Sequence, residues 1–228
     1  MSDYVIPEIK ATEAEMISLR HYLHANPELS LEEFNTSELV ASKLTEWGYQ
    51  VTRGLGKTGV VGSLSKGDSP RTIGLRADMD ALPIEETTGL PWASTVSGKM
   101  HACGHDGHTT ILLAAAKYIA SPACQFNGTV HLIFQPAEEA IGGADLMIKD
   151  GLFEQFPCER IFGLHNMPGL PVGKLGFYAG NFMASADTVK ITLTGYGGHG
   201  AHPERTVDPI VAGAALVMAL QSIVARNV

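Results

Sequence analysis

A short stretch near the middle of the chain gathers residue types that bind transition metals. Residues 101–108 read His-Ala-Cys-Gly-His-Asp-Gly-His and contain three of the chain's nine histidines. In an extended loop, Cys103 and His105 lie on the same side of the backbone, as two ligands of one ion must. A thiolate with an imidazole suits Zn²⁺ and similar borderline ions, and Asp106 can orient a ligating imidazole. The alternative is a polar loop whose histidines satisfy the N-terminus of the next helix.

Two acids follow the strand that we predict over residues 72–77. Asp78 and Asp80 are two positions apart, so their side chains point the same way at the end of the strand. This arrangement suits metal or proton chemistry. A solvated turn before Pro83 explains the same residues equally well.

A second acidic pair and a single histidine follow two other predicted strands. Glu138 and Glu139 come shortly after the strand predicted over residues 129–134, and His165 ends the one predicted over 160–164. Of two adjacent acids, one can bind a metal while the other handles protons. Alternatively, the acids begin a helix and complement its dipole, and the histidine is structural.

All of these groups lie just after a predicted strand or just before a predicted helix. In an open parallel sheet such positions meet at the carboxyl edge, where sites form. One cysteine, several histidines and several carboxylates suit a pair of metals about 3.5–4 Å apart that lowers the pKa of a bound water from 15.7 toward about 7. A free carboxylate beside the ligands can then act as general base. The sequence therefore favours metal-dependent hydrolysis.

Strands and helices alternate along most of the chain, which predicts an α/β fold with a mostly parallel sheet flanked by helices. Two N-terminal helices are expected to open at capping boxes, Thr12-x-x-Glu15 and Ser30-x-x-Glu33, and Gly48 is expected to end the second. Strands are expected at residues 60–64, 72–77, 129–134 and 160–164. Two later helices are expected at residues 109–120 and 144–149.

The pattern changes near Ala184. Alternation from Asp187 predicts a strand with one wet face, and Asp208-Pro209 is expected to open an apolar helix with Asp as its N-cap. A strand and a helix cannot form a core alone. We therefore expect a domain at 1–185 and the incomplete start of an α+β domain at 186–228.

Composition excludes several classes of function. The chain of 228 residues carries a formal net charge of −8, which disfavours nucleic acid and anionic membrane surfaces as partners. The longest apolar run, residues 209–220, is shorter than the about 20 residues that a membrane span needs. The N-terminus has no apolar core typical of a signal peptide, and three cysteines favour reduced thiols. These features predict a cytoplasmic protein.

Two other sites receive little support from the sequence. Residues 54–59 match the glycine-rich dinucleotide pattern, but a strand follows them where a helix is needed, so we expect a turn between strands. The nucleophile elbow of serine hydrolases is absent from the sequence. A cysteine-based hydrolase with Cys103 as nucleophile is the third alternative, although its neighbours resemble metal ligands.

Five motifs together resemble the aminoacylase/carboxypeptidase-like family of co-catalytic metallohydrolases. They are most similar to the branch of hippurate hydrolases, N-acyl-amino-acid amidohydrolases and auxin-conjugate hydrolases. The motifs are residues 74–83, 100–108, 134–139, 163–165 and 197–203. The resemblance implies a zinc-peptidase-like catalytic domain, a satellite (dimerisation) domain from residue 186 onward, and a homodimer.

The resemblance also implies the reaction and the residue roles. The reaction would be hydrolysis of the amide of an N-acyl amino acid with two divalent ions (Zn, Mn, Ni or Co). Glu138 matches the general base, Asp80 the acid that orients the metal cluster, and His199 a residue that reaches the other subunit's site and stabilises the oxyanion. A polar turn is the alternative for His199 and His202. The matching metal ligands are Cys103, His105, Glu139 and His165.

Length is the one departure from this pattern. Members of the family run beyond this length, complete the satellite domain and supply one more metal-binding histidine. Four ligands are few for two ions that each want about four. We therefore expect an N-terminal part of a longer chain, and a truncated product that binds metal without activity is the alternative function.

Overall fold

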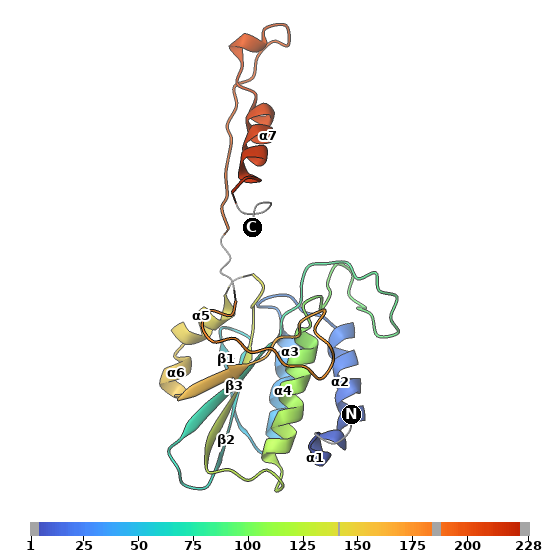
Figure 1. Cartoon of the computed structure of the whole chain (residues 1–228), viewed down its shortest axis with the longest axis vertical. Helices are drawn as coiled ribbons and strands as arrows, with labels where there is room; N and C mark the ends of the chain where they lie inside the picture. Colours follow the sequence, from blue (N-terminus) through green and yellow to red (C-terminus); the bar gives the residue numbers. More distant parts are fainter. Residues whose placement is uncertain (1–4, 141, 184–187, 224–228) are drawn as a thin grey trace. The chain divides into compact units, whose positions relative to one another are not determined.

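One five-stranded sheet forms the centre of the N-terminal part of the chain (Figure 1). The computed structural model describes residues 5–140, 142–183 and 188–223. The strands follow one another across the sheet in the order β1-β2-β4-β3-β5. They are β1 (Gln50–Leu55), β2 (Gly59–Lys66), β3 (Thr72–Asp78), β4 (Gly128–Gln135) and β5 (Arg160–Gly163).

The core of the sheet is parallel, as expected. β3 pairs in parallel with β4 on one side and with β5 on the other, whereas β2 and β1 continue the sheet antiparallel. In the register of these pairs, Asp78 lies opposite Gln135 and Arg76 opposite Gly163. The carboxyl ends of β3, β4 and β5 therefore meet at one edge, and the α/β class with flanking helices is confirmed.

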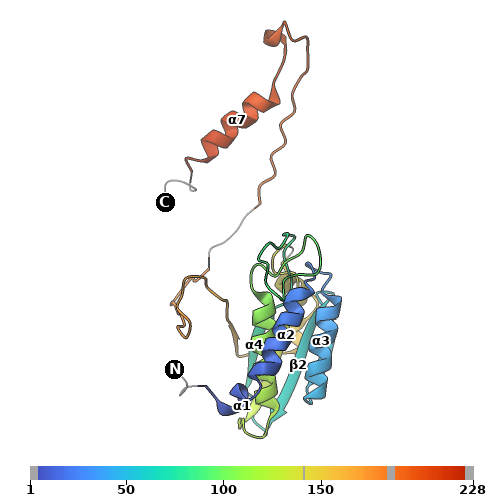
Figure 2. The same cartoon turned by 90° about the vertical axis from the view of Figure 1, so that its right-hand side faces the viewer.

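Helices cover both faces of the sheet. α2, α3 and α4 lie side by side on one face (Figure 2), with the short α1 against α4. On the opposite face, α5 packs against β4 and α6 packs against α5. The helices described in this part are α1 (Pro7–Lys10), α2 (Glu13–Ala25), α3 (Phe34–Glu46), α4 (His105–Ala120), α5 (Gly143–Lys149) and α6 (Leu152–Gln155).

The alternation of side chains along the strands divides the core between these two layers. Leu132 and Phe134 of β4 belong to the cluster under α3 and α4, together with Leu113. Ile133, between them, points to the other face and packs with Met147 and Leu152 of α5 and α6. Because both faces of β4 are buried, the apolar residues of its second half, residues 132–134, follow one another without alternation.

The two expected capping boxes do not form. α2 begins at Glu13, but the Thr12 hydroxyl donates to the Ile9 carbonyl at 2.8 Å instead of capping the helix. α3 begins only at Phe34, because the Ser30 hydroxyl and the Glu33 carboxylate are both used in tertiary hydrogen bonds. The expected helix end at Gly48 is confirmed, with a φ of 86°.

Residues 56–58 form the turn between β1 and β2, so the glycine-rich stretch 54–59 joins two strands, as predicted, and no helix follows it. In the C-terminal part, α7 (Pro209–Leu220) opens as predicted, with the Asp208 carboxylate accepting from the Ile210 amide at 2.8 Å. The prediction of a strand from Asp187 onward is wrong for the residues that the structure describes. Residues 188–195 are irregular, because a strand needs a hydrogen-bonded partner and none pairs with them in the described part.

Two compact units divide the chain, Met1–Leu170 and Pro171–Val228. The boundary that the sequence predicts between residues 185 and 186 lies outside the described residues, so it stays a prediction. Of the helices in the described ranges, none is both long and apolar enough to cross a membrane.

We expect replacement of Leu113 by Ala to lower the free energy of unfolding by about 2–5 kcal/mol, because the side chain is fully buried between α4 and the sheet. Ile111→Ala on the same helix is the matched control, since its side chain is 50% exposed and its loss should cost under about 1 kcal/mol. Urea unfolding followed by circular dichroism measures both values. Equal losses would contradict this description of the core.

Candidate metal centre

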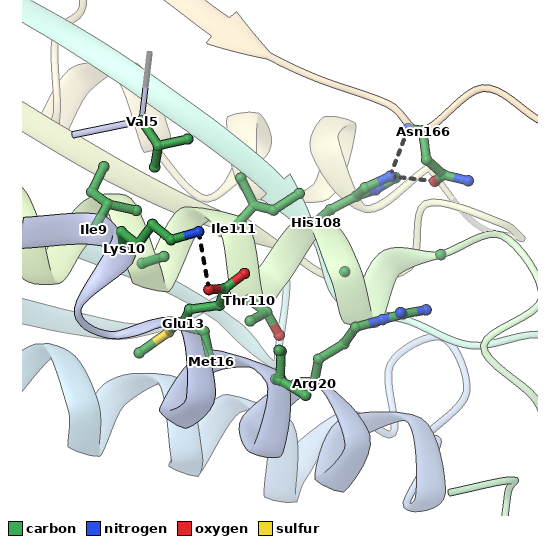
Figure 3. A pocket seen from close by; sticks show the side chains of 14 residues that line it. Val5, Ile9, Lys10, Glu13, Met16, Arg20, His108, Thr110, Ile111 and Asn166 are labelled. Atoms are coloured by element: carbon green, nitrogen blue, oxygen red, sulfur yellow. Dashed lines mark hydrogen bonds and ion pairs between the residues drawn. The ribbon is translucent and has the colours of Figure 1, made fainter. Parts of the chain in front are cut away.

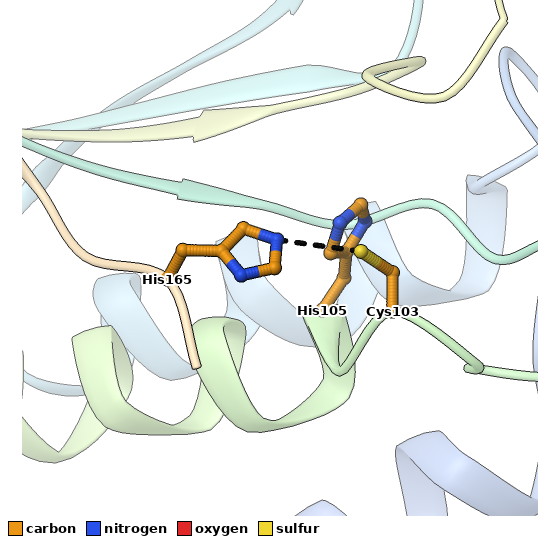
Figure 4. A group of neighbouring side chains, drawn as sticks. All are labelled: Cys103, His105 and His165. Carbon is orange, nitrogen blue, oxygen red and sulfur yellow. Dashed lines mark hydrogen bonds between the residues drawn. The ribbon is translucent and has the colours of Figure 1, made fainter. Parts of the chain in front are cut away.

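Three potential metal ligands meet where α4 begins (Figure 4). Cys103 lies just before the helix, His105 is its first residue, and His165 follows β5. Their ligand atoms all lie within 4.8 Å of one another, and Cys103 Sγ is 3.3 Å from His165 Nε2. Gly104 makes this turn possible, because its φ of 93° suits glycine and a Cβ there would come within 2.5 Å of the Asn166 side chain.

The acidic pair after β4 approaches the same imidazole. His105 Nε2 lies 3.7 Å from Glu139 Oε1 and 3.9 Å from Glu138 Oε2. The Glu139 side chain is 20% exposed, whereas that of Glu138 is 42% exposed and reaches water more freely. The structure thus brings the four expected ligands together at His105, and Glu138 lies beside them.

The chemistry of this group fits a divalent cation. Within the described residues, His105 Nε2 and Glu139 Oε1 are buried without a hydrogen-bond partner. Leaving such a group unpaired costs about 1–3 kcal/mol, more when it is charged. A cation that both atoms ligate removes this penalty, and thiolate, imidazole and carboxylate together suit borderline ions such as Zn²⁺.

Asp80 holds His105 from the opposite side of the ring. Its buried carboxylate accepts from His105 Nδ1 at 3.2 Å, from the Ser30 hydroxyl at 2.7 Å and from the Glu139 amide at 3.0 Å. Burial by itself would raise the pKa of Asp80, but these hydrogen bonds outweigh it and lower the pKa. An ionised Asp80 only accepts, so Nδ1 carries a proton and Nε2 is the nitrogen that can ligate a metal.

The acids around His105 favour a positive charge on its ring. Burial by itself would lower the pKa of His105, but the hydrogen bond to Asp80 and the charges of Asp78 and Glu139 raise it. The field that favours a proton on the imidazole is the same field that favours a bound cation. This electrostatic preference agrees with the unpaired atoms described above.

Asp78 anchors a second chain of contacts that sequence reasoning did not foresee. Its carboxylate lies 2.7 Å from His108 Nδ1 and accepts from the Arg76 guanidinium at 2.7 Å. His108 Nε2 in turn lies 2.6 Å from the Asn166 side-chain oxygen (Figure 3). Because Asn166 follows His165, this chain ties β3 and α4 to the segment that carries a candidate ligand. Membership of His108 in the histidine-rich motif was the only signal for it.

Asp106 does not lie where we expected it. Its buried carboxylate accepts from Arg20 Nε at 3.1 Å and lies 2.9 Å from His24 Nδ1, so its partners come from α2 and are not candidate ligands. His101, close to this pair, is also buried, and burial lowers its pKa to about 4. Asp106 therefore joins α2 to α4 behind the site.

His199 belongs to the C-terminal unit. Its Nδ1 accepts from the Ala201 amide at 3.1 Å, and its ring lies 5.9 Å from that of His202. Both histidines are exposed in the turn that precedes α7. The role expected for His199 stays a prediction.

A mainly apolar cavity of about 510 Å³ runs along α1, α2 and α4 (Figure 3). Val5, Ile9, Met16 and Ile111 point into it, and Lys10 and Glu13 form an ion pair at its wall. It borders the site where Gly104, His108 and Asn166 line it.

A comparison with protein families matches residues 74–226 of the chain to peptidase family M20/M25/M40. The chain belongs to this family. The matched stretch contains every candidate ligand described above, and the family expected from the motifs is confirmed.

Comparison with curated proteins agrees with this assignment. The chain is 55% identical to hippurate hydrolase of Campylobacter jejuni, over 98% of this chain and 58% of the relative. It is 44% identical to the N-acetyl-L-cysteine deacetylase of Bacillus subtilis, over 96% and 52%. The chain thus spans about half the length of the curated relatives it matches.

Two solved structures share the fold. A putative aminohydrolase from Staphylococcus aureus superposes with a TM-score of 0.77 at 36% identity, over 96% of this chain and 58% of that one. A dinuclear metal-binding M20 peptidase from Bacillus subtilis gives 0.67 at 42% identity, over 72% and 45%.

The strong hydrogen bonds of Asp78 predict a loss of stability in acid. Burial would raise its pKa, but His108 and Arg76 outweigh burial and bring the pKa from 3.8 to about 2. A lowered pKa stabilises the fold above about pH 4, and this contribution, about 2 kcal/mol, is lost as the pH falls from 4 to 2. The difference in unfolding free energy between the wild type and Asp78→Asn should therefore shrink over this range.

Urea titrations from pH 5 to pH 2 in a chelating buffer measure this difference. The exposed Asp68 supplies the control, because Asp68→Asn removes a carboxylate that is not buried. If the difference in unfolding free energy between the wild type and Asp78→Asn stays constant with pH, the lowered pKa of Asp78 is refuted.

Proposed function

We propose that this M20 protein is a metal-dependent amidohydrolase that cleaves the amide bond of N-acyl amino acids. The observation that carries the proposal is the convergence of Cys103, Glu138, Glu139 and His165 on His105, whose Nε2 has no hydrogen-bond partner among the described residues. Two relatives named for hydrolysis of N-acyl amino acids, hippurate hydrolase and N-acetyl-L-cysteine deacetylase, support the reaction class.

Cys103, His105, Glu139 and His165 would hold two divalent cations. Bound cations supply Lewis acidity at this place, which lowers the pKa of water toward about 7. The dinuclear site named for the Bacillus subtilis neighbour supports a pair of ions. Zn, Mn, Ni and Co all suit the donors, and the substrates that we propose are hippurate-like or N-acetyl amino acids.

Glu138 would act as the general base. Its carboxylate is the more exposed of the acidic pair and lies 3.9 Å from His105 Nε2, so it can reach a water molecule beside the ligands. It takes a proton from the attacking water and gives it to the departing amine nitrogen. Asp80, which bonds His105 Nδ1, keeps the imidazole oriented through both steps.

His199 would stabilise the oxyanion of the tetrahedral intermediate from a second copy of the chain. This role requires a homodimer and assigns residues 186–228 to a dimerisation domain beside a catalytic domain at 1–185. Three free thiols support a cytoplasmic location.

The Cys103–His165 pair also raises the alternative of a cysteine nucleophile, which requires a thiolate. Burial, the hydrogen bond to Glu139 and the nearby acids raise the pKa of Cys103 to about 12. Without a cation the thiol therefore stays protonated and unreactive, whereas a cation would deprotonate it as a ligand. This electrostatic setting favours the metal site.

The proposal predicts that hydrolysis of hippurate or N-acetyl amino acids depends on metal. Activity should fall to background after dialysis against a strong chelator and return with Mn²⁺ or Zn²⁺. Cys103→Ala should bind less metal than the wild type, measured by elemental analysis. Turnover that survives chelation would support a cysteine nucleophile. Bound metal without turnover would support the alternative of a truncated product that binds metal but is inactive.

Replacement of Glu138 by Gln should leave metal binding nearly unchanged and lower kcat by about 10²–10⁴-fold, because the amide cannot accept the proton from water. Release of the amino acid, followed by an amine-reactive dye, gives the rate, and elemental analysis gives the metal content. Glu154→Gln in α6 is the control, since that residue lies away from the site. Retained activity in Glu138→Gln would show that another group is the base.

A further inference from the structure

The segment between α2 and α3 carries a buried carboxylate that has no part in the chemistry proposed above. Glu33 has no exposed surface, and burial raises its pKa against the effect of its hydrogen bonds. Its carboxylate accepts from the Thr58 hydroxyl at 2.6 Å and from the Ala137 amide at 2.8 Å. A buried acid of this kind persists only where its hydrogen bonds serve the structure or the function.

The Ala137 amide, which donates to Glu33, belongs to a residue with an unusual backbone conformation. Ala137 has a φ of 50°, a left-handed conformation that is unfavourable for a residue with a Cβ. Its carbonyl accepts from the Gly143 amide at 2.9 Å, so both backbone polar groups of this residue are held. Residues in such strained conformations persist only when their surroundings determine them.

The two residues after Ala137 are the acidic pair of the site. The direction in which Glu138 and Glu139 leave the turn depends on the backbone angles of Ala137. The Glu139 amide donates to Asp80, which also accepts from the Ser30 hydroxyl. One segment, residues 30–33, therefore holds both Asp80 and the turn that carries the acidic pair.

We propose that Glu33 is a positioning residue for the metal centre. Its carboxylate fixes the left-handed turn at Ala137 and so sets where Glu139 presents its carboxylate to a cation and Glu138 to the water. The role rests on the proposed function, since it assigns a purpose to Glu33 only if Glu139 ligates a metal. Glu33 contacts neither substrate nor metal and acts through the Ala137 amide alone.

Metal affinity tests this role separately from catalysis. Zn²⁺ is titrated into the metal-free chain in competition with a chromophoric chelator, and kcat and KM are measured on the same samples. Glu33→Ala should bind Zn²⁺ about 10–100-fold more weakly, because residues that orient ligands typically contribute that much. Glu33→Gln should retain most of the affinity, since its amide oxygen can still accept from Ala137 while its nitrogen donates to Thr58.

Two variants control for stability. Glu32→Gln changes the neighbouring acid, which is exposed and pairs with Lys99, and should bind Zn²⁺ like the wild type. Thr58→Val removes the other partner of Glu33, so it should lower the free energy of unfolding without weakening Zn²⁺ binding. If Glu33→Ala does not fold, Glu33→Asp replaces it, because a shorter carboxylate cannot reach both partners.

The outcomes separate this inference from the proposed function. The positioning role is supported if Glu33→Ala binds Zn²⁺ more weakly than the wild type, while Glu33→Gln and Thr58→Val keep most of the Zn²⁺ affinity. Wild-type affinity in Glu33→Ala, or an equal loss in Thr58→Val, overturns it and leaves the amidohydrolase proposal intact. A wild-type chain that binds no divalent cation overturns both.

Discussion

The site depends on one electrostatic constraint, the gathering of acids around a buried imidazole. Asp80 bonds one nitrogen of His105, and Glu138 and Glu139 approach the other within 4 Å. Such a group of like charges is unfavourable unless a cation compensates it, and the unpaired His105 Nε2 and Glu139 Oε1 lie where a cation can do so. The fold must therefore hold these groups together against their mutual repulsion until a metal binds.

The parallel core of the sheet provides the rigidity for this. β3, β4 and β5 end at one edge, and each delivers a different part of the site from its carboxyl end. Beyond the strands, hydrogen bonds take over the positioning. Asp78 and His108 tie the segment of His165 to α4, while Ser30 and Glu33 hold Asp80 and the Ala137 turn. Residues from five separated segments thus hold the site together, namely 30–33, 78–80, 105–108, 137–139 and 165–166.

The motifs pointed to residues that the structure brings together, because their chemistry is local. A cysteine and a histidine two positions apart, followed by a helix, suggest a metal wherever the fold places them. The roles of Ser30 and Glu33 were predicted wrongly for the opposite reason. Their spacing matches a capping box, but each side chain has a tertiary partner, Asp80 or Ala137, and that partner is invisible in the local sequence. Asp106 likewise turned toward Arg20 and His24 on α2.

The sequence by itself determined the α/β class, the family and the residues that can bind metal, because alternating apolar patterns and short chemical motifs depend on neighbours along the chain. Tertiary structure alone decided which acids bond which imidazole nitrogen, that Asp78 pairs with His108, and that Glu33 holds Ala137. These contacts join residues from 25 to 104 positions apart. Only the register of the sheet and the packing of α2, α3 and α4 bring such residues within hydrogen-bond distance.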